Sequence, residues 1–227
     1  MSEHDRRIFL KCLATLTGGV VLVPAISACS GGPSATAGDE PATPVKAETP
    51  PVPLVEPATW DPIDFNRVRG NAGAIPESYL PKINGPDGVT HHLGKHLPYF
   101  PHVPHSLVPE GYVALMWGDA ARGYARHPQA EKNESNDMHG HWYNWIRIRK
   151  AVEGDAEELQ STYSDWPGTA PGDNGAYAVF GDGEITEDKG RNTIYLAALP
   201  GDVKEGDRIR IYAHCLTHGE YVDFLTL

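Results

Sequence analysis

Residues 208–225 read RIRIYAHCLTHGEYVDFL, two short strand-like stretches joined by a loop. The first, Arg208–Ala213, alternates polar with apolar residues, and the second, Tyr221–Leu225, is rich in aromatic and branched side chains. The loop holds a cysteine and a histidine three residues apart, and Gly219 after them permits a sharp exit. Two such side chains in a tight loop can both turn onto one ion. The stretch therefore predicts two strands with a candidate metal-binding loop at their junction.

Similar apolar or alternating stretches recur upstream, separated by turn-forming groups rich in Gly, Pro and Asp. They are Tyr112–Trp117, Trp142–Arg149, Ala176–Phe180 and Thr193–Leu199. Several strands at this spacing predict an all-β protein, most simply a β-sandwich. Only Ala151–Thr162 has the pattern of a helical turn or two. Four prolines between Trp60 and Gly88 block any long regular element, so residues 59–89 are expected to form an irregular N-terminal extension.

The composition excludes several classes of protein. Among 227 residues, 30 are acidic and 19 basic, for a formal net charge of −11. A nucleic-acid partner is not expected, because phosphate binding needs clustered Lys and Arg. Three cysteines are too few for a disulfide framework or a four-cysteine iron centre.

The first thirty residues resemble an export signal. Arg6-Arg7 precedes a moderately apolar run, as in twin-arginine signals, and Ile26-Ser27-Ala28-Cys29 resembles the site at which bacterial lipoproteins are cleaved and lipidated on cysteine. We expect residues 1–28 to be the signal peptide and 29–58 a Pro-rich tether. The protein would then be a periplasmic or cell-surface lipoprotein, anchored to the membrane through Cys29.

Histidine is concentrated in the remaining chain, where ten of the eleven lie between His91 and His218. After removal of residues 1–28 and lipidation of Cys29, Cys215 would be the remaining free thiol. A lone thiol in an oxidising compartment is a liability unless something protects it, and metal coordination is one such protection.

Four local motifs occur in a recognisable order. They are Lys95-His96-Leu97-Pro98, His127-Pro128, His141-Trp142 followed by Trp145-Ile146, and Cys215-Leu216-Thr217-His218-Gly219. In order and local context they resemble the superoxide reductase (neelaredoxin and desulfoferrodoxin) family. The resemblance covers about residue 90 to the C-terminus, and it implies that residues 90–227 form an immunoglobulin-like sandwich of about seven strands.

The resemblance also implies a function. It implies one mononuclear non-haem iron, held by His96, His127, His141, Cys215 and His218. The implied enzyme reduces superoxide by one electron to hydrogen peroxide, with an external electron donor as partner. Lys95 matches the family's catalytic lysine, whose positive charge would focus an anionic substrate onto an acidic domain. The sequence leaves open whether the chain forms a homo-oligomer.

The sequence departs from the family pattern at several positions. Gly94 stands where the family usually has Glu, so either the protein supplies no sixth iron ligand or a carboxylate comes from elsewhere. His102 is an alternative to His96, and His139 is an alternative to His141. The other histidines of this region are expected at the surface or in hydrogen bonds, and they are His91, His92, His105 and His214.

Three other functions remain as alternatives. One is an exported lipoprotein that binds or senses iron without catalysis. A blue-copper electron carrier would need a weak axial Met after the C-terminal Cys and His, and no Met follows Met138. Structural zinc fits less well, since zinc prefers four ligands.

Overall fold

The computed structural model describes residues 47–227, apart from 105, 107, 128–139, 165–175 and 181–191. The described residues belong to one compact unit, Val45–Leu227. The predicted signal peptide, Cys29 and most of the predicted tether lie outside the described residues.

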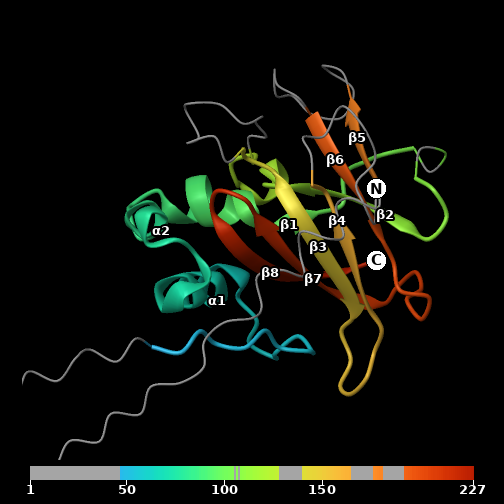
Figure 1. The fold of residues 1–227 in the computed structure, drawn as a ribbon, viewed down its shortest axis with the longest axis horizontal. Helices are drawn as coiled ribbons and strands as arrows, with labels where there is room; N and C mark the ends of the chain where they lie inside the picture. Colours follow the sequence, from blue (N-terminus) through green and yellow to red (C-terminus); the bar gives the residue numbers. More distant parts are fainter. Residues whose placement is uncertain (1–46, 105, 107, 128–139, 165–175, 181–191) are drawn as a thin grey trace, which may run out of the picture. The chain divides into compact units, whose positions relative to one another are not determined.

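The strands form two four-stranded sheets in which every neighbouring pair is antiparallel (Figure 1). The first has the order β1 (Pro98–Tyr99), β2 (Tyr112–Trp117), β6 (Asn192–Ala198) and β5 (Ala176–Phe180). The second has the order β4 (Glu158–Thr162), β3 (Tyr143–Lys150), β7 (Arg208–Cys215) and β8 (Gly219–Thr226). The predicted all-β sandwich is confirmed, and β2 to β8 are its seven strands of five or more residues.

The core lies between the sheets, and β2, β6 and β7 supply alternate residues to it, as the two-residue period of a strand requires. From β7 the buried row is Ile209, Ile211, Ala213 and Cys215, and from β2 it is Val113, Leu115 and Trp117. Each fully buried large aliphatic side chain stabilises the fold by about 1.5–3 kcal/mol. Cys215 is the last residue of its row, so the apolar core ends at a thiol.

One predicted element is wrong. The segment Ala151–Thr162 was expected to hold a helical turn, but it contains β4, which pairs with β3 in the register Ile146 to Ser161. The buried Ser161 hydroxyl accepts a hydrogen bond from the backbone N–H of Ala198 on β6. Pairing with the preceding strand β3 and the side-chain contact with β6 therefore override a weak local helical pattern.

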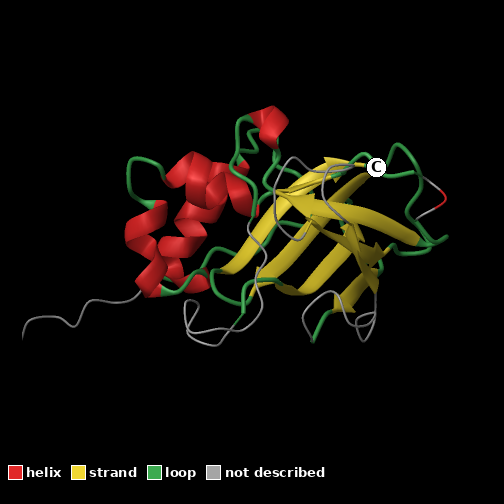
Figure 2. Cartoon of the chain, turned by 90° about the horizontal axis from the view of Figure 1, so that it is seen from above, coloured by secondary structure: helices red, strands yellow, loops and turns green. Residues whose placement is uncertain are grey.

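The extension is more regular than predicted, because it consists mainly of short helical segments beside the strands (Figure 2). The helices are α1 (Pro62–Arg69) and α2 (Leu80–Ile83), and the single turns are Gly70–Ala74, Glu77–Tyr79, Gly88–Leu93 and Gly94–His96, with a further turn at Ala120–Arg122 after β2. Two of the four prolines lie in the first turns of α1 and α2, where a missing N–H costs nothing. Asp61 caps α1 by accepting from the N–H groups of Ile63 and Asp64.

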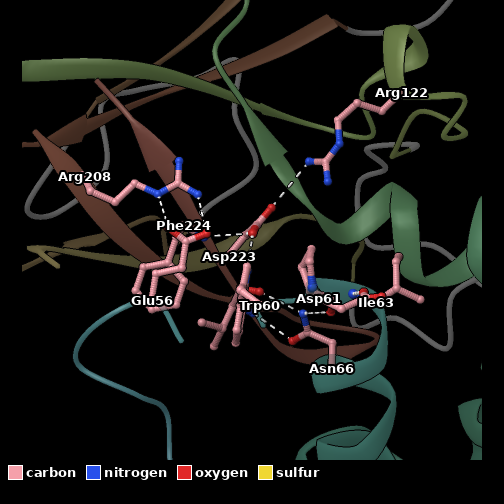
Figure 3. Close-up of polar contacts among 11 residues, drawn as sticks. Glu56, Trp60, Asp61, Ile63, Asn66, Arg122, Arg208, Asp223 and Phe224 are labelled. Atoms are coloured by element: carbon pink, nitrogen blue, oxygen red, sulfur yellow. Dashed lines mark hydrogen bonds and ion pairs between the residues drawn. The ribbon is translucent and has the colours of Figure 1, made fainter. Parts of the chain in front are cut away.

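Polar contacts join the extension to β8, the edge strand of the second sheet (Figure 3). The buried Asn66 amide donates to the carbonyl of Val222 at 2.8 Å and accepts from its N–H at 2.9 Å. The indole N–H of Trp60 donates to Asp223 at 3.0 Å. A side-chain amide thus satisfies backbone groups that an edge strand would leave unpaired.

The segment before α1 also contacts the second sheet. Arg208 forms an ion pair with Glu56, and Arg210 donates to the carbonyl of Pro53 at 3.2 Å. Among the described helices, none is long and apolar enough to span a bilayer.

Candidate metal centre

His96 is positioned by the helical turn Gly94–His96, just before β1. Its Nδ1–H donates to the carbonyl of His92, so Nε2 carries the lone pair in the neutral ring. Gly94 is needed here for close packing, because a Cβ at this position would lie 2.2 Å from the ring of Tyr124. A larger residue at this position would therefore require the Tyr124 ring to move.

His127 follows the end of β2, after the turn Ala120–Arg122. Its backbone N–H donates to the carbonyl of Trp117 at 3.2 Å, and the N–H of Gly118 donates to the carbonyl of Leu97 at 3.0 Å. These two bonds place the imidazole beside His96, with the ring centroids 4.8 Å apart.

The other three side chains come from the segment before β3, from β7 and from the loop between β7 and β8. His141 lies just before β3, and Cys215 pairs with Tyr143 across β7 and β3. The loop is fastened by two bonds, from the N–H of Leu216 to the carbonyl of Trp142 and from the hydroxyl of Thr217 to the carbonyl of Gly140. The loop that carries His218 is thereby tied to the segment that carries His141.

Gly219 closes this loop in a conformation that favours glycine. Its φ is +86°, and a Cβ would lie 2.5 Å from the carbonyl oxygen of Ala74. Both the left-handed backbone and the contact with the extension thus require glycine, as its place after the Cys-x-x-His motif suggested.

All five predicted ligands lie together at one end of the sandwich. One potential ligand atom from each of His96, His127, His141, Cys215 and His218 falls within 4.8 Å of all the others, and all five residues are buried. The structure thus brings together every side chain that the sequence motifs singled out, and their binding of a metal stays a prediction.

The closest contacts converge on Nδ1 of His218. Nε2 of His96 lies 3.0 Å away, Nε2 of His141 2.9 Å away, and Sγ of Cys215 3.6 Å away. One ring nitrogen carries at most one proton and can donate to only one of these neighbours. Lone pairs therefore face one another in a buried space, an arrangement that a shared cation stabilises.

Burial holds these groups in uncharged forms. It is the main cause that lowers the pKa values of His96 and His127 well below the usual range, and that of His218 to about 2. It also raises the pKa of the Cys215 thiol to about 12. Neutral imidazoles are ready to bind metal, and a coordinating cation would deprotonate the thiol. The donor set therefore fits a transition-metal ion.

Aromatic rings pack against the imidazoles and fix their planes. Tyr221 of β8 stacks on His96 with the centroids 4.1 Å apart and the planes 6° from parallel. Tyr79 from the extension stacks on His218 at 4.0 Å and 29°. Motif reasoning missed both tyrosines, since neither belongs to a ligand motif and Tyr79 lies in a segment predicted to be irregular.

Lys95, the predicted catalytic residue, lies half-buried next to His96. Its Nζ is 5.7 Å from the centroid of the Tyr79 ring. Burial lowers the pKa of Lys95 to about 8, while the Cys215 group acts to raise it. The structure places a cation beside the cluster, and its catalytic role stays a prediction.

The alternatives separate clearly where the structure describes them. His102 is exposed and outside the cluster, whereas His139 lies outside the described residues. Among the described residues, no carboxylate belongs to the cluster, so none replaces the family's Glu there.

The remaining histidines have other environments. His91 is exposed, and His92 shares a hydrogen bond with Tyr79. His214 donates to Asn144 at 2.6 Å and stacks on Trp145. His105 lies outside the described residues.

Comparison with known proteins gives little further information. No protein-family model matches the sequence, and no curated protein matches it. A solved structure of superoxide reductase (neelaredoxin) from Archaeoglobus fulgidus, in the reduced form, is similar at 16% identity and a TM-score of 0.30. The match covers 59% of this chain and 89% of that chain. The assignment of the site therefore depends on the geometry of the five side chains.

Proposed function

We propose that this protein is a superoxide reductase that binds one iron ion through His96, His127, His141, Cys215 and His218. The observation that carries the proposal is the convergence of four imidazoles and one thiol within 4.8 Å, buried at the end of a β-sandwich. The order of the motifs along the chain, which resembles that of the superoxide reductase family, supports the same assignment.

The donor set favours iron over the other metals considered. Zinc prefers four ligands in a tetrahedron, and blue copper uses two histidines, one cysteine and a weak axial group. Five donors of mixed nitrogen and sulfur character exceed both requirements. An iron ion held by these five side chains would supply the electron and a coordination position for superoxide.

The chain's own residues prepare this chemistry. The bond from His96 to the His92 carbonyl directs Nε2 into the cluster, and the tyrosine stacks fix the planes of two imidazoles. The reaction consumes one electron and two protons for each superoxide, giving one hydrogen peroxide. An external donor must return the electron, and the Lys95 ammonium attracts the anion and can supply a proton.

The proposal extends to location. The twin-arginine-like Arg6-Arg7 and the lipobox-like residues before Cys29 support export and a lipid anchor. A Cys29→Ser variant, expressed as the full chain in a bacterium with this export route, should move from the membrane fraction to the soluble fraction. Wild-type protein that is soluble and unlipidated would contradict this part alone.

The central test combines metal analysis with kinetics. Purified protein should contain about one iron per chain, and the ferrous form should be oxidised by pulses of superoxide faster than the radical decays by itself. Without that reaction, a chain that still holds iron would be a binding or sensing protein. Copper or zinc in place of iron would contradict the assignment of the metal.

A further inference from the structure

Tyr79 belongs to the helical extension, yet it lies in the metal centre. It ends the turn Glu77–Tyr79, is 4% exposed, and stacks on the ring of His218. Its hydroxyl shares a hydrogen bond of 2.9 Å with Nδ1 of His92, whose carbonyl accepts from Nδ1 of His96. Tyr79 therefore contacts one predicted ligand directly and a second through His92.

Two lysines from different elements approach the same tyrosine ring. Lys82 of α2 and Lys95 of the turn Gly94–His96 each place Nζ 5.7 Å from the Tyr79 centroid. Lys82 is exposed and Lys95 half-buried. Neither forms an ion pair with a carboxylate among the residues that the structure describes. The two ammonium groups thus lie near the same tyrosine ring, which stacks on His218 at one side of the five-residue cluster.

The field of both lysines reaches the metal centre. Tyr79, whose ring both ammonium groups approach, stacks directly on the imidazole of His218 with the ring centroids 4.0 Å apart. The charge of Asp87 acts on His92 in the opposite sense to the charges of the two lysines. The chain has a net charge of −11, which repels anions at long range. The two lysines create a local positive region that attracts them.

We propose that Lys82, Tyr79 and Lys95 form an entrance that attracts small monovalent anions to the metal centre, with Lys82 as a steering residue that does not touch the substrate. The proposal rests on the proposed function for the identity of the physiological anion. It assigns a role to the extension, since α2 supplies Lys82 and the preceding turn supplies Tyr79.

The expected effect of Lys82 is moderate. It is an exposed charge, so salt screens its field over about 8 Å at physiological ionic strength. Removal of one such charge should slow association of an anion by about threefold at low salt, and reversal of the charge by about tenfold. Both effects should shrink as ionic strength rises.

The test compares iron-loaded wild-type protein with Lys82→Gln, Lys82→Glu and Lys204→Gln. Lys204 is an exposed lysine in the turn before β7. Cys215 is at the other end of that eight-residue strand, so Lys204 is a matched control that lies far from the metal centre. The first measurement is the dissociation constant of azide for the ferric protein, titrated spectroscopically at low and high salt. The second is the rate constant of the ferrous protein with superoxide.

We expect azide to bind about threefold more weakly to Lys82→Gln and about tenfold more weakly to Lys82→Glu at low salt, with Lys204→Gln unchanged. Iron content should be the same in all four proteins. Weakened azide binding in a protein that does not reduce superoxide would support the entrance and refute the proposed function. Suppose that the wild-type protein reduces superoxide and that Lys82→Gln gives the same results as Lys204→Gln in both measurements. That outcome would overturn the entrance alone. Wild-type protein that binds no azide would also overturn it.

Discussion

The attachment of the extension to β8 can be tested at one buried side chain, Asn66. It is 1% exposed, and its amide makes three hydrogen bonds, to the Pro62 carbonyl at 2.7 Å and to the carbonyl and N–H of Val222 at 2.8 and 2.9 Å. Substitution by Ala removes all three and leaves both backbone groups of Val222 without this partner.

The magnitude follows from these contacts. Each lost hydrogen bond costs about 1 kcal/mol, and a buried backbone group left unpaired costs about 1–3 kcal/mol. Alanine is the better helix former by about 0.6 kcal/mol, which offsets a small part of the loss within α1. Three lost bonds less the helix propensity term give a loss of about 2–3 kcal/mol, and the unpaired backbone groups of Val222 add about 1 kcal/mol or more, so we expect Asn66→Ala to lower the free energy of unfolding by at least about 3 kcal/mol.

The assay is urea unfolding of residues 29–227, followed by circular dichroism and by tryptophan fluorescence. Asn84→Ala is the matched control, because the Asn84 side chain makes one exposed hydrogen bond, to Asn71. That variant should lie within about 0.5 kcal/mol of wild type. Equal stability of the two variants would refute the idea that Asn66 attaches the extension to the sheet.

Three further predictions concern the metal centre and its surroundings. His96→Ala should lose most of its bound iron, measured by metal analysis, whereas the exposed His102→Ala should retain it; retention by both would exclude His96 as a ligand. Gly94→Ala should destabilise the fold by about 2–3 kcal/mol, because the added Cβ would lie 2.2 Å from a tyrosine ring. In Gly201→Ala the nearest atom to the added Cβ is 3.9 Å away, so this control should be close to neutral. Thermal unfolding of both variants measures the difference. Burial raises the pKa of Asp223, so the folded protein binds its proton more tightly than the unfolded chain does. The stability that this group contributes should therefore increase as pH falls from neutral through the raised pKa. Asp223→Asn should lack this component when unfolding is measured at several pH values between about 7 and about 4, and a pH dependence equal to that of wild type would contradict the prediction.

The position of the cluster explains why a β-sandwich suits this chemistry. Cys215 ends the inward-facing row of β7, and its loop is fastened to the segment before β3. Packing of the core therefore fixes the thiol before any ion binds. The turn just before β1 supplies His96, and the extension adds the aromatic contact of Tyr79, so the cluster depends on the extension as well as on the sandwich.

The sequence determined the strands and the candidate ligands through local signals. The six predicted strands agree with β2, β3 and β5 to β8 within two residues at either end, because a two-residue period and flanking turns are visible in the sequence itself. The order and local context of the four motifs, through their resemblance to the superoxide reductase family, selected the five side chains that the structure brings together.

Only the tertiary structure decided which neighbours these side chains have. Nothing local shows that Tyr79 would stack on His218 or that Lys82 would approach the same ring, since the extension and the C-terminal loop meet only after folding. The contact between His96 and His218 joins residues 122 positions apart. The state of residues 158–162 was likewise decided by pairing with β3, which supplies hydrogen bonds that a short isolated helix could not match. Local propensity and motif spacing act over a few residues, whereas burial and pairing act between segments that the chain brings together only in the folded state.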